Sequence, residues 1–138
     1  MGVLLSPDYR PSEDEPFMNE RQREYFRRRL ISWKEEILRE SKETLQNLAQ
    51  ETLTHADLAD RASTESERGN ELRARDRQRK LISKIDSALR RIDDGTYGFC
   101  EDSGDPISLR RLEARPIATL SIEAQERHER RERVYRDD

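Results

Sequence analysis

The sequence predicts a mainly α-helical protein built around a long antiparallel coiled-coil hairpin, and three observations carry this prediction. Only 32% of the 138 residues are hydrophobic and 41% are charged, which is little apolar material for a compact globule of this length. The 27 lysines and arginines nearly balance the 30 aspartates and glutamates, whereas disordered chains favour a high net charge. Apolar residues recur at helical spacing in two long stretches. Long helices with narrow apolar seams satisfy all three observations.

The charge is small overall but uneven along the chain. A net charge of −3 and a pI near 5.6 do not predict a general nucleic-acid binder, and we expect no direct sequence-specific DNA binding. Between residues 68 and 91, however, nine lysines and arginines stand against three acids, which indicates a basic helix in an acidic protein. The first residues lack a signal-peptide pattern, no stretch approaches membrane-spanning length, and the single Cys100 excludes an intrachain disulfide. We therefore expect a cytoplasmic protein without membrane contact.

The hairpin is expected over residues 19–94, after a flexible N-terminal tail of residues 1–18 that carries three prolines. Asn19 is the expected N-cap, with Gln22 three residues later as in a capping box. The two seams consist of Phe26, Leu30, Trp33, Ile37, Ser41, Leu45 and Leu48, then Leu72, Leu81, Ile82, Ile85, Leu89 and Ile92. Two helices of about 30 residues each would bury one another's seams, and the small and polar residues near 54–66 would form the tip.

A small globular region is expected over residues 95–120, followed by a C-terminal helix over 121–138. Gly95 ends the second long helix, residues 102–106 have turn chemistry, and Ile107–Leu109 is a plausible short strand. Ser121 is the expected N-cap of the last helix. The region must be held by apolar packing on the base of the hairpin, by Phe99, Ile107, Leu109, Leu112, Ile117, Leu120 and Ile122.

Positions 100, 103, 121 and 124 have the spacing of a four-cysteine zinc module, which makes this region a degenerate zinc finger. They hold Cys100, Ser103, Ser121 and Ala124, and only the first is a good ligand for structural zinc. We therefore expect no bound zinc, with Cys100 acting as a small, semi-buried hydrophobe. The two histidines lie far apart with no neighbouring nucleophile arrangement, so no catalytic site and no enzyme activity are expected.

Two polar constellations remain open to interpretation. Asp57 and Asp60, near Ala62, lie three residues apart and so on one side of a helical turn. They are either part of a solvated loop or carboxylates that reach into a partner's cavity, and composition does not decide between these. The alternating arginines from Arg73 to Arg79 are scattered around their helix, so they cannot all serve one patch; some must face outward.

Four stretches carry a resemblance to a known family: Asp57-x-x-Asp60-Arg61-Ala62, the run from Glu71 to Ile85, Gly95-x-Tyr97-Gly98-Phe99-Cys100-Glu101, and the run from Ile107 to Pro116. Together they resemble the DksA/TraR family of bacterial regulators that bind RNA polymerase directly. The resemblance implies a coiled coil inserted through the polymerase's secondary channel. It also implies that the protein acts together with guanosine tetraphosphate (ppGpp). The two would destabilise open complexes at ribosomal RNA promoters and activate amino-acid biosynthesis promoters. A transcript-cleavage-type elongation factor, which shares this architecture, is the alternative.

The resemblance also implies roles for residues at matching positions. These are Asp57, Asp60 and Ala62 at the coiled-coil tip, Arg73 and Arg77 in polymerase binding, and Leu81, Lys84 and Arg115 in ppGpp binding. The sequence departs from the family pattern at the zinc cysteines, and Gln125 stands where family members usually have a ppGpp-binding lysine. We accordingly expect a zinc-free, single-cysteine member that acts as a monomer.

Overall fold

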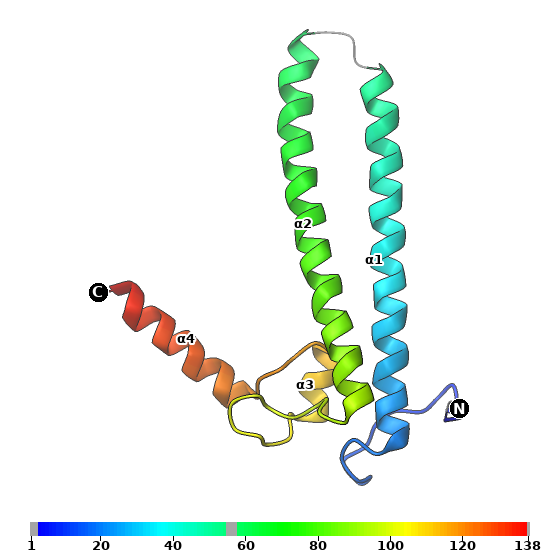
Figure 1. The fold of residues 1–138 in the computed structure, drawn as a ribbon, viewed down its shortest axis with the longest axis vertical. Coiled ribbons are helices and arrows are strands. Elements are labelled where there is room, and N and C mark those ends of the chain that lie inside the picture. Colours follow the sequence, from blue (N-terminus) through cyan, green and yellow to red (C-terminus); the bar gives the residue numbers. More distant parts are fainter. Residues whose placement is uncertain (1–2, 55–57, 138) are drawn as a thin grey trace. The chain divides into compact units, whose positions relative to one another are not determined.

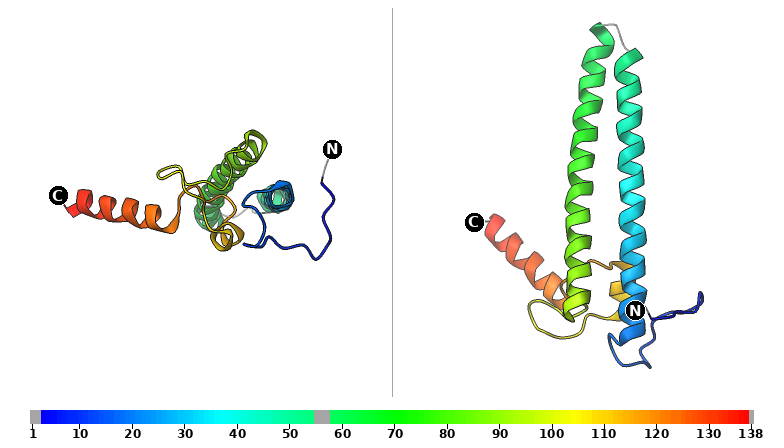
Figure 2. Two further views of the ribbon diagram at one scale, coloured as in Figure 1. Left: turned by 90° about the horizontal axis from the view of Figure 1, so that it is seen from below. Right: turned by 45° about the vertical axis from the view of Figure 1, so that its right-hand side comes forward.

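The protein is mainly helical, as the sequence predicts. The computed structural model describes residues 3–54 and 58–137, with side chains for 3–47, 49–50 and 66–134. Within these residues the elements are α1 (Glu20–Thr54), α2 (Leu58–Asp94), α3 (Leu109–Ala114) and α4 (Ile122–Asp137). Helices α1 and α2 run antiparallel side by side (Figure 1 and Figure 2). No helix of the described residues is long and apolar enough to span a membrane.

The prediction of a short strand at Ile107–Leu109 is wrong. Ile107 is buried in irregular structure, and Leu109 begins α3. Ser108 caps this helix, because its hydroxyl accepts a hydrogen bond from the Arg111 N–H at 3.2 Å. The described residues contain only an isolated bridge between Phe99 and Pro106 in place of a strand. A serine cap followed by good helix formers was the available signal for α3, and it outweighs the apolar alternation.

Helix α1 begins as predicted, with one difference in its cap. The Asn19 side chain accepts a hydrogen bond from the Gln22 N–H at 2.9 Å. In a capping box the Gln22 side chain would accept from the cap residue's own N–H. Here it accepts from Met18 N–H at 2.8 Å and donates to the Ser12 carbonyl at 3.2 Å. Gln22 is fully buried, and its side-chain oxygen bonds Met18, whose backbone has a left-handed conformation (φ 54°) that non-glycine residues rarely adopt.

The chain divides into two compact units, residues 31–86 and the remainder. The larger unit, residues 1–30 with 87–138, is organised around Tyr97, whose ring centroid lies 5.5 Å from that of Phe26. The Tyr97 hydroxyl donates a hydrogen bond to the Pro116 carbonyl at 2.8 Å, and burial raises the pKa of this tyrosine. Other fully or nearly buried side chains here are those of Leu30, Ala88, Ile92, Ile107, Leu109, Leu112, Ile117 and Ala118. Of the predicted packing residues, Phe99 and Ile122 are exposed instead.

The segment before α1 packs on this larger unit. The rings of Phe17 and Phe99 meet edge to face with centroids 5.4 Å apart. Gly98 has a positive φ of 91°, and a Cβ there would lie 3.1 Å from the Met18 side chain. Glycine is therefore needed at this position for both its conformation and the close approach.

The smaller unit, residues 31–86, contains the thinner part of the hairpin. Ile37 and Ile85 are buried in its seam, Lys34 pairs with Asp86 at 2.7 Å, and Ser41 donates to Gln78 at 2.6 Å. The prediction that Leu45 and Leu72 lie in the seam is wrong, because these side chains are 42% and 60% exposed.

Helix geometry explains both errors. Two steps of four residues from Ile37 through Ser41 turn Leu45 by about 80° off the seam at 3.6 residues per turn. By the same geometry, Leu72 lies nine residues before Leu81, or about half a turn away.

The Tyr97 hydroxyl should contribute measurably to the stability of the larger unit. Tyr97→Phe leaves the Pro116 carbonyl without its buried donor, so we expect the free energy of unfolding to fall by about 1–3 kcal/mol. The measurement is urea denaturation followed by circular dichroism. Tyr25→Phe is the matched control, since the Tyr25 hydroxyl makes no hydrogen bond among the described residues. Equal denaturation midpoints for the two variants would contradict the assignment.

Candidate functional site

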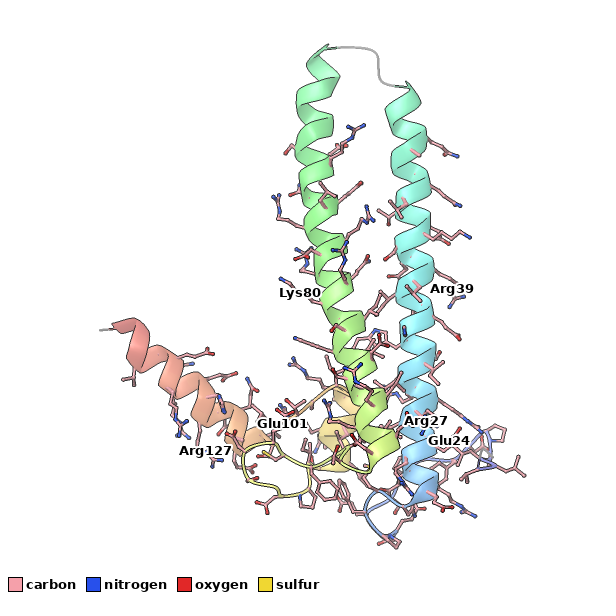
Figure 3. The ribbon with its side chains drawn as sticks, viewed as in Figure 1. Glu24, Arg27, Arg39, Lys80, Glu101 and Arg127 are labelled. Atoms are coloured by element: carbon pink, nitrogen blue, oxygen red, sulfur yellow. The ribbon has the colours of Figure 1, made fainter. Side chains whose placement is uncertain are left out.

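A basic face runs along the outer side of α2 in the smaller unit. Arg73, Arg77, Lys80 and Lys84, separated by steps of four, three and four, share one face of the helix and are all exposed. Figure 3 shows Lys80 pointing away from α1. Lys80 pairs with Asp76 at 3.1 Å and Arg73 bonds the Asn70 side chain, whereas Arg77 and Lys84 have no partner among the described side chains. We call these four residues the basic flank.

Most side chains of the predicted tip lie outside the described residues. Asp57 falls outside the described residues. Asp60 and Ala62 belong to the first turns of α2, and their side chains are outside the described set. Their functional assignment therefore stays a prediction.

The residues assigned to ppGpp come from both units. On α2, Leu81 is half-buried and Lys84, three residues later, is exposed on the adjoining face. Arg115 follows α3 in the larger unit, with an exposed side chain and a backbone N–H that donates to the Arg111 carbonyl at 2.7 Å. Gln125 donates a hydrogen bond from its side-chain amide to Glu129 at 3.3 Å.

The segment with zinc-finger spacing folds as a tight knuckle. The Cys100 N–H donates to the Asp105 carbonyl and the Gly104 N–H to the Cys100 carbonyl, both at 2.8 Å. Ser121 caps α4 as predicted, accepting from the Ala124 N–H at 3.2 Å. The Glu101 N–H donates to the Thr119 carbonyl at 2.9 Å, so the knuckle and the segment before α4 are tied by backbone.

A side-chain pair that the sequence reasoning missed ties the knuckle directly to α4. His128 Nε2 lies 2.8 Å from Asp102 Oδ2. The two residues are 26 positions apart, and no motif spacing signals the contact. Only the three-dimensional closure of the knuckle brings them together.

The Cys100 sulfur lies at the centre of this knuckle. The side chain is only 3% exposed, and the sulfur is hydrogen-bonded by Ser103 and Ser121. Burial raises the pKa of the thiol, but these hydrogen bonds outweigh it and lower the pKa from 9.0 to about 6. Cys100 is thus more than the small hydrophobe that its sequence suggested, because Ser103 and Ser121, at two positions with zinc-ligand spacing, supply its polar partners.

The four positions do not fit a structural zinc ion. They offer one thiolate, two hydroxyls and the buried methyl group of Ala124, whereas structural zinc takes four sulfur or nitrogen ligands. The described residues contain no group of three or more histidine, cysteine or acidic side chains that could hold a metal.

A hairpin of two long helices followed by a zinc-finger-type knuckle and a terminal helix defines a recognisable class of bacterial protein. Residues 22–92 match the family model for the N-terminal domain of the DnaK suppressor protein DksA. Residues 95–130 match the model for the prokaryotic dksA/traR C4-type zinc finger. The chain belongs to the DksA/TraR family.

Relatives in this family match nearly the whole chain. The RNA polymerase-binding transcription factor DksA of Caulobacter vibrioides is 73% identical over 136 residues, covering 99% of this chain and 96% of its own. The protein of the same name from Escherichia coli strain K12 is 42% identical over 96% of this chain and 90% of its own. The solved structure of transcription factor DksA2 from Pseudomonas aeruginosa, 42% identical, superposes with a TM-score of 0.80 over 87% of this chain and 95% of its own.

The serine hydrogen bonds make a direct prediction for the thiol. Ser103→Ala removes a hydrogen bond that favours the thiolate, so the pKa of Cys100 should rise above about 6, as followed by the ultraviolet absorbance of the thiolate during a pH titration. Ser87→Ala, a serine that bonds Arg90 instead, should leave the pKa unchanged.

The same shift has a consequence for stability. A thiol whose pKa is lower in the folded than in the unfolded state stabilises the fold above its unfolded pKa, and this contribution is lost as the pH falls through the folded value. The free energy of unfolding of the wild-type protein should therefore rise, relative to Cys100→Ser, as the pH increases from about 6 to 9. Parallel pH profiles for the two proteins would contradict the shift.

Proposed function

We propose that this chain is a transcription regulator that binds RNA polymerase directly through its hairpin and acts at the polymerase active site through its tip. The observation that carries the proposal is the match to relatives named RNA polymerase-binding transcription factors along nearly the entire chain, including the hairpin and the knuckle. These names describe transcription factors rather than enzymes. Such a protein acts where the polymerase is, in the bacterial cytoplasm, as a monomer and without reading a DNA sequence.

The geometry of the hairpin supports this role. A hairpin of two helices is narrow, and α1 and α2 are 35 and 37 residues long, or roughly 50 Å each at 1.5 Å per residue. The basic flank lies along its outer side, where Arg77 and Lys84 are available to a partner. Arginine and lysine on a long, slender support suit a binding site inside a protein cavity with acidic walls.

In the proposed mechanism, Asp57, Asp60 and Ala62 act at the tip, and Arg73 and Arg77 contact the rim of the polymerase's secondary channel. The protein shortens the life of open complexes at ribosomal RNA promoters and activates amino-acid biosynthesis promoters. Leu81, Lys84 and Arg115 form its share of a ppGpp site at the polymerase surface. A lysine and an arginine suit the ligand's phosphates as a point charge and a bidentate fork. Gln125 offers no charge, so ppGpp is held by fewer cations than in relatives with lysine there.

The proposed protein needs no zinc. The fold of the knuckle is supported by the hydrogen bonds to Cys100, by the His128–Asp102 pair and by buried Ile107 and Leu112. Each of these contacts is available without a metal.

Replacing the tip carboxylate should separate regulation from binding. Asp60→Asn keeps the size of the side chain but removes its charge, so transcription from a ribosomal RNA promoter should no longer be inhibited, while polymerase affinity stays near that of the wild type. The assay is run-off transcription with and without ppGpp. Normal inhibition by this variant would refute the tip assignment. Stimulated RNA cleavage in backtracked complexes would instead support a transcript-cleavage factor.

Removal of any bound metal should change neither the fold nor the regulatory activity of the protein. We expect elemental analysis of the purified protein to find far less than one zinc per chain, and prolonged treatment with a chelator to leave both helicity and promoter inhibition unchanged. One tightly bound zinc per chain would show that other ligands replace the missing cysteines.

A further inference from the structure

An apolar stripe on α1 is left uncovered by the fold of the smaller unit. Ile31, Leu38 and Leu45 are spaced by seven residues, and their side chains are 40%, 49% and 42% exposed. A seven-residue period keeps side chains on nearly one line of a helix. The hairpin's own seam lies elsewhere on α1, since Ile37 is buried there while its neighbour Leu38 is not.

The stripe and one residue of α2 lie on the same side of the hairpin. The Lys34–Asp86 ion pair bridges the two helices at 2.7 Å, and Lys34 lies one turn from Ile31 and from Leu38. On α2, Leu72 lies fourteen residues before Asp86, on the same seven-residue line, and it is 60% exposed. We call Ile31, Leu38, Leu45 and Leu72 the apolar flank.

The apolar flank and the basic flank are on different sides of the hairpin. On α2, Lys84 and Arg77 are turned by about 100° one way from buried Ile85, whereas Asp86 is turned by about 100° the other way. The hairpin therefore presents two chemically distinct surfaces, one cationic and one apolar.

The size of the apolar flank argues against a second copy of this chain as its occupant. Burying one leucine completely removes on the order of 100 Å² of apolar surface, so four half-exposed side chains supply roughly 200 Å². A stable complex needs about 800 Å² per partner. The flank is thus too small to hold a dimer alone but suits the apolar centre of a larger interface.

The charges around the stripe favour a protein surface over nucleic acid. Exposed Glu35 and Lys42 alternate with the apolar side chains of α1, and exposed Arg79 lies between Leu72 and Asp86 on α2. Nucleic acid would favour cations alone, whereas an apolar centre with a rim of both charge signs is typical of protein interfaces.

We propose that the apolar flank docks on an apolar surface of RNA polymerase, as a second contact beside the basic flank. This inference rests on the proposed function, because the polymerase is the partner large enough to cover both flanks at once. The two contacts differ in physical character. Salt weakens the electrostatic binding through the basic flank, but it does not weaken the hydrophobic binding through the apolar flank.

The test is the affinity of the full chain for core RNA polymerase, measured by fluorescence anisotropy at low and high salt. Leu38→Gln/Leu45→Gln should bind about tenfold more weakly, and this factor should persist at high salt. Arg77→Gln should also weaken binding, but its effect should shrink as salt rises. The matched control, Ile122→Gln/Val134→Gln, removes two exposed apolar side chains from α4 and should bind within about twofold of wild type.

The outcomes separate this inference from the proposed function. If wild type fails to bind core polymerase, the proposed function is wrong and the docking site loses its partner. If wild type binds and Leu38→Gln/Leu45→Gln binds equally well, only the docking site is wrong. Dimerisation of wild type in sedimentation velocity, abolished in this variant, would show that the occupant is a second copy. Glutamine has a helix propensity close to that of leucine, and circular dichroism, with the single variant Leu45→Gln as a milder change, checks folding.

Discussion

The packing of Tyr97 against Phe26, with its hydroxyl on the Pro116 carbonyl, is the interaction on which the larger unit depends. It joins the first helix, the end of the second and the chain leading to α4 at one buried point. A protein with only 32% hydrophobic residues can form few such buried clusters, so each cluster contributes a large part of the free energy of unfolding. Among the described side chains beyond Ile31, the hairpin is held by contacts that include buried Ile37 and Ile85, the Lys34–Asp86 ion pair and the hydrogen bond from Ser41 to Gln78.

The helices were predictable because they rest on local periodicity and capping, which a sequence displays directly. Asn19 and Ser121 cap where the sequence places them. The two seam errors have one origin: at 3.6 residues per turn, steps of eight and nine residues rotate a side chain away from the seam. Leu45 and Leu72 belong to the apolar pattern but have turned away from the seam. Helix α3 was missed because six residues are too few to display a period, whereas a buried alternation imitates a strand.

The candidate site divides in the same way. That the basic residues of α2 include an outward-facing set follows from their spacing alone, and the ligand count at positions 100–124 already excludes a closed zinc shell. What the sequence could not supply is the arrangement around the Cys100 sulfur and the His128–Asp102 contact, since both arise from tertiary closure. Ser121 holds two roles that sequence reasoning treats separately, as helix cap and as partner of the thiol.

The contacts of the N-terminal segment also determine when the protein can fold during synthesis. Phe17 and Met18 pack on Phe99 and Gly98, some eighty residues later in the chain. Phe26 likewise can pack only after Tyr97, 71 residues later in the chain, has been synthesised. Long sequence separation delays such contacts, so most of the chain must leave the ribosome before its first helix finds its buried partners. Until residue 97 has emerged, the Phe26 side chain on α1 lacks the partner that buries it in the folded protein.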